Sequence, residues 1–250
     1  MRLIAAALAL ALGTPGPAGA QASVNRATDA AITAPTAAAL ARAVAPSELM
    51  VPLEVDVGRQ AILSLASLDD DAKALEAEYP GIWQAVWNRI EPEVRRYVEA
   101  DYPKFWSRLE ALYSSRLTES EAQALLAFYR SPTGQKMLRT MLAGQDSASF
   151  IAGVVSSENG TVSAEQLRSA TQASRLKAVQ SIGPADDEQL NALMNAISLD
   201  KFRAVGADTQ RVTLEWVNEE DPAFDANLEK LMKAALEAHM AKGSPEKSSR

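Results

Sequence analysis

Hydrophobic residues recur every three or four positions along most of this chain, which is the pattern of helices that bury one face. Strict alternation of apolar and polar residues, the pattern of a half-buried strand, is nearly missing. The pattern therefore predicts an all-α fold in which the helices pack as an irregular bundle. The apolar stripes predict helices over residues 36–44, 56–68, 82–97, 105–113, 118–130, 132–144, 163–182, 190–197, 202–216 and 224–236.

Prolines and small polar residues indicate where these helices begin, bend or end. Pro92 lies inside an apolar stripe that continues on both sides of it, so we expect one kinked helix there. Pro103 is expected to start a new helix, and the segment around Pro52 is expected to be irregular. Thr36 is the expected cap of the first helix.

The stretch LLAFYRSPTG at residues 125–134 interrupts a helical pattern and predicts a tight corner. Ser131 is expected to cap the second helix, and Pro132 fits its first position, where a backbone N–H would have no partner. Gly134 falls on the buried stripe, where the lack of a side chain lets another backbone approach closely. Together with a capping box formed by Thr118 and Glu121, these residues predict a helix-corner-helix hairpin at residues 118–143.

Residues 117–138, LTESEAQALLAFYRSPTGQKML, closely resemble the motif of a bacterial secreted family known as domain of unknown function 2059. The resemblance covers roughly residues 85–145 and implies an all-helical fold and export past the inner membrane. It brings no catalytic residues, and we assign the motif a structural role. The matching positions are Leu117, Thr118, Glu121, Phe128, Tyr129, Ser131, Pro132, Gly134 and Lys136.

The first 20 residues have the features of a secretory signal peptide. Arg2 precedes an apolar run over residues 3–12, helix breakers follow, and Ala18 and Ala20 offer small residues for cleavage after Ala20. A membrane span needs about 20 apolar residues, and the run at residues 3–12 is about half of that length. No later segment is long and apolar enough either, so we expect no membrane anchor after cleavage. The sequence therefore predicts a periplasmic or secreted bacterial protein.

The remaining chain is expected to fall into four parts. Residues 21–35 are a flexible lead-in, residues 36–145 an N-terminal helical domain, residues 146–242 a C-terminal helical region, and residues 243–250 a disordered tail. The two helical parts form either one unit or two sub-bundles that meet near residues 145–165. Residues 159–161 match a glycosylation acceptor, but we interpret them as a turn.

Composition restricts the chemistry that the chain can support. It has no cysteine, which rules out disulfides and thiolate chemistry. Removal of Arg2 with the signal peptide leaves 24 basic against 32 acidic residues, a net charge of −8. This acidity favours a soluble protein and argues against nucleic acid as a partner.

The acidic run Asp69, Asp70 and Asp71 is interpreted as a helix cap and first turn, because the spacing of a calcium loop is missing. His239 is the only histidine, and no metal site or cofactor is predicted. Three tryptophans, Trp83, Trp87 and Trp106, are expected in the core; exposure of any of them in a groove would instead favour a binding site.

Two weaker hypotheses concern charged residues. An anion could bind at the corner, where Arg130, Ser131, Thr133 and Lys136 surround a helix N-terminus. Acidic residues close together in sequence could also form a catalytic pair, which would require a cleft. These are Glu91, Glu93, Glu99 and Asp101.

The sequence contains no catalytic constellation, and we predict a non-catalytic function. The expected role is the binding of an envelope protein or a small ligand in a groove between helices. Two alternatives remain: an envelope hydrolase that uses carboxylates, and a structural or self-associating helical protein. A deep pocket with two facing acids would favour the hydrolase, whereas a shallow groove lined by Met137, Met141 or Met232 would favour binding.

Overall fold

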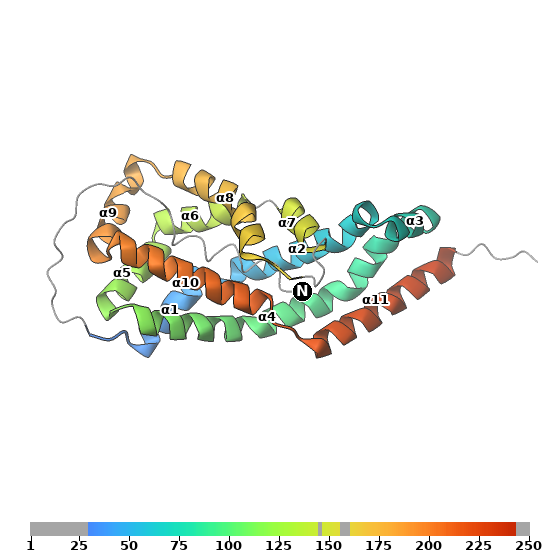
Figure 1. Ribbon diagram of the computed structural model, residues 1–250, viewed down its shortest axis with the longest axis horizontal. Coiled ribbons are helices and arrows are strands. Elements are labelled where there is room, and N and C mark those ends of the chain that lie inside the picture. The colour runs from blue at the N-terminus through green and yellow to red at the C-terminus, as the bar shows by residue number, and fades with distance from the viewer. Residues whose placement is uncertain (1–29, 145–146, 156–160, 244–250) are drawn as a thin grey trace, which may run out of the picture.

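The computed structural model describes residues 30–144, 147–155 and 161–243 (Figure 1). These residues are almost entirely helical and confirm the predicted all-α bundle; outside the helices they contain an isolated bridge between Ala31 and Thr118. The helices are α1 (Ala34–Val44), α2 (Ser47–Leu68), α3 (Asp70–Glu78), α4 (Ile82–Arg116), α5 (Glu119–Arg130), α6 (Pro132–Ala143), α7 (Ser147–Val155), α8 (Ala164–Gln180), η2 (Pro184–Asp186), α9 (Asp187–Ala196), α10 (Leu199–Val217) and α11 (Pro222–Gly243).

The long helix α4 organises the bundle and packs against α1, α2, α10 and α11. It continues through Pro92, as predicted, and also through Pro103, where the predicted restart was wrong. Both prolines are exposed, so the carbonyl groups that they leave without a helical partner can bind water. Tyr102 and Phe105, on either side of Pro103 in the sequence, are buried, and their packing keeps the helix continuous.

The N-terminal helices differ from the prediction in two places. Helix α2 begins at Ser47 and runs through the exposed Pro52, so the expected irregular segment is helical. Helix α1 is capped by Thr33 and not by Thr36, because the Thr33 hydroxyl accepts from the Thr36 N–H at 3.4 Å. The Thr36 hydroxyl donates instead to Glu119 Oε1 at 2.6 Å, which joins α1 to the start of α5.

Other predicted helix starts are confirmed. Asp69 Oδ1 accepts from the N–H of Ala72 at 2.8 Å, so the acidic run begins α3 as a cap and first turn. Ser163 forms a capping box at the start of α8, and Asp221 Oδ1 accepts from the N–H of Phe224 at the start of α11. In α9 the predicted stripe is only partly buried, because Met194 is 42% exposed.

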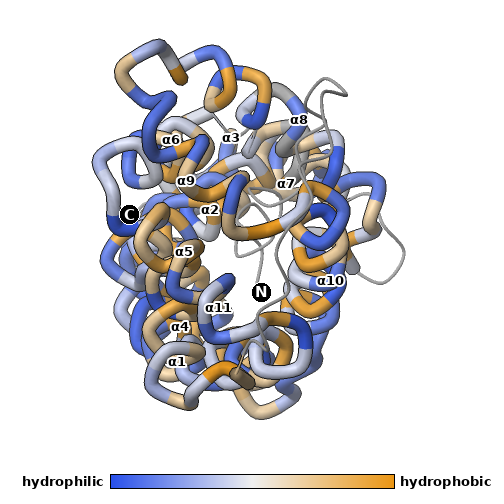
Figure 2. The backbone as a smooth tube through the Cα atoms, turned by 90° about the vertical axis from the view of Figure 1, so that its left-hand side faces the viewer, coloured by the Kyte–Doolittle hydropathy of each residue, from blue (hydrophilic) through white to orange (hydrophobic). Residues whose placement is uncertain are grey.

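One hydrophobic cluster runs through the molecule, from Leu40 in α1 to Ala235 in α11. It therefore includes side chains from both residues 36–145 and residues 146–242. Phe105 and Trp216 stack in it with ring centroids 4.4 Å apart, which ties α4 to α10. Figure 2 looks along the long axis and shows hydrophobic and hydrophilic positions mixed within the helical tubes, as expected for helices with one buried face.

Several predictions concern residues that the structure does not describe. The signal peptide with its cleavage residues Ala18 and Ala20, most of the lead-in, the Asn159–Gly160 turn and residues 244–250 lie outside the described ranges. Within those ranges, no helix combines the length and hydrophobicity that a membrane crossing requires.

Candidate functional site

The corner between α5 and α6 has the predicted geometry. Ser131 caps α6: its Oγ accepts from the Gly134 N–H at 3.1 Å and donates to the Phe128 carbonyl at 2.7 Å. Pro132 occupies the first helical position. A Cβ atom on Gly134 would lie 2.0 Å from the Phe128 carbonyl oxygen, so the position requires glycine because two backbones meet there.

The start of the hairpin is held by the predicted capping box. The Thr118 hydroxyl accepts from the Glu121 N–H, and the Glu121 carboxylate accepts from the Thr118 N–H at 2.8 Å. The same carboxylate forms an ion pair with Lys201, which attaches α10 to the hairpin. The remaining apolar motif residues Leu117, Phe128 and Tyr129 are buried in the core.

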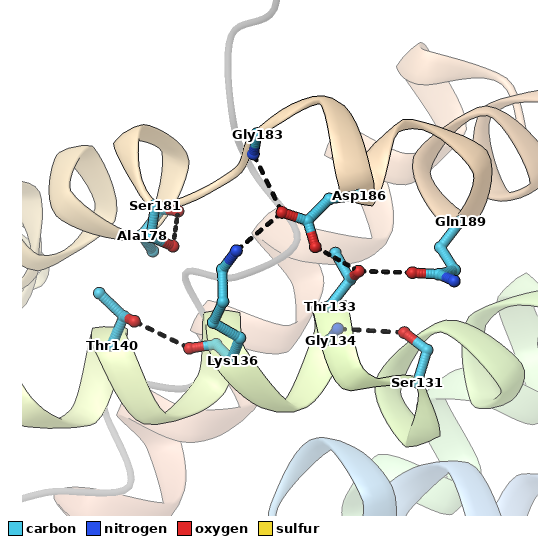
Figure 3. Close-up of polar contacts among 10 residues, drawn as sticks. All are labelled: Ser131, Thr133, Gly134, Lys136, Thr140, Ala178, Ser181, Gly183, Asp186 and Gln189. Carbon is cyan, nitrogen blue, oxygen red and sulfur yellow. Dashed lines mark hydrogen bonds and ion pairs between the residues drawn. The ribbon is translucent and has the colours of Figure 1, made fainter.

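Lys136 and Thr133 bind a carboxylate of the same chain, that of Asp186 (Figure 3). Lys136 Nζ lies 2.7 Å from Asp186 Oδ2, and the buried Thr133 hydroxyl donates to Asp186 Oδ1 at 2.6 Å. The Gly183 N–H donates to Asp186 Oδ2 at 2.9 Å. These groups, first of all Lys136, hold the pKa of Asp186 well below its usual range.

The anion site expected at the corner is therefore not assembled from the four predicted residues. Ser131 is occupied as a helix cap, while Lys136 and Thr133 are occupied by Asp186. Through these bonds to Asp186, Lys136 and Thr133 attach the short η2 turn and the start of α9 to α6. Arg130 lines a separate feature, whose described lining includes neither Lys136 nor Thr133.

That feature is a hollow of about 600 Å³ between the corner, α1, α4 and the start of α2, which we call the corner hollow. Its walls come from elements that are far apart in the sequence. The lining residues are Pro35, Ala38, Ala39, Arg42, Ala43, Pro46, Ser47, Glu48, Trp106, Arg130 and Gln135.

Trp106 and Arg42 form a fixed part of the wall. The Trp106 indole N–H donates to the Ala45 carbonyl at 2.9 Å, and the partly exposed ring faces Arg42. The Arg42 guanidinium carbon lies 5.3 Å from the ring centroid, within the range of a cation–π interaction. Arg42 Nη1 also donates to the Ala38 carbonyl at 3.2 Å. Of the three tryptophans expected in the core, Trp83 and Trp87 are buried, whereas Trp106 lines the hollow.

Among the described residues that line the corner hollow, three are charged: Arg42, Arg130 and Glu48. Neither Arg42 nor Arg130 forms an ion pair with any residue in the described ranges, and both are exposed. Glu48 lies in the first turn of α2, where its charge meets the positive end of the helix. Pro46, the N-cap of α2, provides no side-chain cap, and Pro46, Ser47 and Glu48 at the start of this helix line the hollow.

The acidic residues considered as a catalytic pair do not meet in a cleft. Glu91 and Glu93 form ion pairs with Arg95 and Arg96 on α4, and Glu99 is exposed. Asp101 is buried, but its Oδ2 accepts from the indole N–H of a core tryptophan, Trp216, at 2.7 Å.

A second buried carboxylate, Glu54, contacts Tyr102, the residue that follows Asp101. The Tyr102 hydroxyl donates to Glu54 Oε1 at 2.7 Å, and Lys104 Nζ lies 3.0 Å from Asp101 Oδ1. Burial, followed by the charges of Glu54 and Asp101, raises the pKa of Tyr102 well above its usual range. In the described part of the chain, neither carboxylate is among the lining residues of the hollows at the corner, on α11 or between α4 and α10.

The methionines named as indicators of a binding groove lie in different places. Met137 and Met141 are buried in the core, whereas Met232 lines a smaller hollow of about 360 Å³ on α11, with Leu228 and Leu236. Within the described residues no three His, Cys, Asp or Glu side chains are grouped so that they could hold a metal ion. His239 Nε2 lies 3.2 Å from the Pro80 carbonyl oxygen.

Sequence reasoning missed most of the corner hollow. Arg42, Ser47 and Gln135 were not singled out, because the hollow joins residues that no sequence periodicity connects. On sequence grounds Arg130 was grouped with Thr133 and Lys136, whereas in the structure it lines the hollow with Arg42 and Trp106. From the sequence, a tryptophan exposed in a groove was expected to favour a binding site. Trp106 meets that condition in the corner hollow.

Comparison with known proteins agrees with the motif. Residues 104–149 match the model of a family described as "Uncharacterized protein conserved in bacteria (DUF2059)", which confirms the resemblance found at residues 117–138. The matched segment covers the end of α4, the whole hairpin and the first residues of α7. No curated protein and no solved structure matches the chain.

Proposed function

We propose that this chain, which shares residues 104–149 with a family of uncharacterised bacterial proteins, is an exported, non-catalytic binding protein of the cell envelope. The corner hollow is its ligand site. Export is supported by the basic start, the apolar run and the small residues of the first 20 positions. The observation that carries the binding function is the hollow itself, with a partly exposed tryptophan and two arginines that have no ion-pair partner in the described ranges.

The size of the hollow suits a small ligand. Its volume of about 600 Å³ falls within the range of roughly 300–1,000 Å³ that is typical of small-molecule sites. Its walls come from α1, α2, α4, α5 and α6, and α1 packs against both α4 and α5. Trp106, Arg130 and Gln135 lie within the segment that matches the family, which places part of the wall in the shared region.

The carboxylate hydrolase is supported less well. A catalytic acid must reach its substrate, yet the buried Glu54 and Asp101 accept hydrogen bonds from Tyr102 and Trp216 in the core. Their arrangement satisfies the polar ends of two aromatic side chains that would otherwise be buried without a partner. These carboxylates therefore have a structural explanation.

Native mass spectrometry tests the proposal directly. The protein is purified gently from the envelope fraction of its own host, and its mass is compared under native and denaturing conditions. We expect a stoichiometric extra mass in the native spectrum only, and a denatured mass that corresponds to a chain beginning at Gln21. A bare monomer would contradict tight binding, and a full-length chain that retains residues 1–20 would contradict export.

A pair of matched variants locates the ligand. Ala39→Trp adds a large side chain to the wall of the corner hollow, whereas Ala226→Trp adds the same side chain at an exposed position of α11. We expect the extra mass to be lost in the first variant and retained in the second. Circular dichroism checks that both variants are folded, and equal retention of the ligand would place the site elsewhere.

A further inference from the structure

We propose that the corner hollow recognises its ligand through an oxyanion, a carboxylate, phosphate or sulfate group, held between Arg42 and Arg130. This inference rests on the proposed function in taking the corner hollow as the ligand site. It adds the chemical class of the ligand, a small molecule that carries such a group.

The first argument is the state of the two guanidinium groups. The chain is acidic, with a net charge of −7, and arginines in the groove between α4 and α10 are taken by carboxylates. Arg108 pairs with Glu219 at 2.6 Å, and Arg211 pairs with Glu215 at 2.8 Å. Arg42 and Arg130 line one concave surface and have no such partner in the described ranges. A guanidinium presents a planar set of donors that matches an oxyanion, so two of them in one hollow provide the binding chemistry.

The second argument is that Arg42 is positioned before a ligand arrives. Its contact with the Trp106 ring and its bond to the Ala38 carbonyl restrict the guanidinium. Trp106 is itself held by the bond from its indole N–H to the Ala45 carbonyl. Because less side-chain entropy is lost on binding, the remaining Arg42 donors favour association.

The rest of the wall contains one group that favours a negative ligand and one that opposes it. The Ser47 hydroxyl offers a further donor at the N-terminus of α2. Glu48 is the one acid among the described residues that line the hollow, and its charge opposes an anion. Removal of this charge should therefore strengthen binding, which is an effect that a purely structural role of the arginines would not produce.

Isothermal titration calorimetry of the mature chain tests the oxyanion with two probes that share a phenyl ring. Phenyl phosphate carries the anionic group and benzyl alcohol is neutral. We expect phenyl phosphate to bind with a stoichiometry of one. Its affinity should fall as salt is added, and inorganic phosphate or benzoate should displace it. Benzyl alcohol should not bind; equal binding of the two probes, or no binding of any anion, would overturn the proposal.

Charge variants identify the residues. Arg42→Gln and Arg130→Gln should each weaken phenyl phosphate binding about tenfold, the effect of one lost charged hydrogen bond. Glu48→Gln should strengthen it several-fold. Arg89→Gln, an exposed arginine roughly 25 Å along α4 from Trp106, is the control and should leave it unchanged. Unchanged affinity in both Arg42→Gln and Arg130→Gln would refute the assignment of these two arginines. Urea unfolding is the folding control, and midpoints close to the wild-type value would show that the variants are folded.

The outcomes separate this inference from the proposed function. If the ligand from the host is retained by Arg42→Gln and Arg130→Gln but lost by Ala39→Trp, the hollow binds a ligand and the oxyanion is wrong. If phenyl phosphate binds as expected but the protein from the host is bare, the oxyanion site is correct and the envelope binding function fails.

Discussion

Replacement of Gly134 by alanine is expected to destabilise this protein, although the same change stabilises an exposed helix. Alanine is the better helix former by about 1 kcal/mol. At this position, however, the new Cβ would lie 2.0 Å from the Phe128 carbonyl oxygen and 2.9 Å from Tyr129 Cα. Both are backbone atoms, so a change of rotamer cannot relieve the overlap, and α6 must move away from α5.

The size of the effect follows from these opposing contributions. Additional atoms in a packed core cost typically about 1–3 kcal/mol, and an overlap with backbone belongs at or above the upper end of that range. After subtraction of the gain in helix propensity, the expected net loss in the free energy of unfolding is about 2 kcal/mol. For a domain of this size, that loss lowers the midpoint of thermal unfolding by about 4–8 °C.

Urea unfolding followed by far-ultraviolet circular dichroism measures this loss. Gly183→Ala is the matched control, because Gly183 has φ −133° and a Cβ there would meet no atom within 4 Å. We expect the control to change stability by less than about 0.5 kcal/mol. If Gly134→Ala were as stable as the wild-type protein, α5 and α6 would separate easily, and the close approach would not explain the glycine.

Two further predictions concern polar contacts. Lys136 holds the pKa of Asp186 well below its usual range, so the stabilisation is present above the unfolded-state pKa of about 4 and is lost as pH falls below it. Asp186→Asn should therefore be less stable than the wild-type protein at neutral pH. The difference between the two urea midpoints should begin to shrink once the pH falls below about 4 and should continue to shrink at lower pH. A difference that does not depend on pH would contradict this. Tyr102→Phe removes a hydroxyl donor from the buried Glu54 and should lower the free energy of unfolding by about 1–3 kcal/mol, measured by urea unfolding; a loss below about 0.5 kcal/mol would show that this bond contributes little.

The parts of the fold that sequence reasoning predicted depend on interactions within one or two helical turns. Thr118 caps α5 by binding the backbone three residues ahead, and Ser131 caps α6 in the same way. The requirement for glycine at position 134 could also be inferred, because the residue lies on the apolar stripe of its own helix and is buried. Local spacing contains all of this information.

The predictions that failed depend on what lies opposite a residue in space. Pro103 has the local features of a helix start, yet α4 continues through it because the proline faces solvent and Tyr102 and Phe105 pack in the core. Met194 belongs to an apolar stripe by spacing, but no neighbouring element covers it completely.

The sequence by itself determined the helical class and the capped hairpin, because each is encoded by residues close together along the chain. Only the tertiary structure decided that Lys136 binds Asp186 and that Arg130 shares a hollow with Arg42 and Trp106. A guanidinium or ammonium group reaches any acid or ring that folding brings near it, and its own sequence neighbours do not specify which one. The family motif therefore indicates how the corner is built, while the surface beside it arises from helices that meet only in the folded bundle.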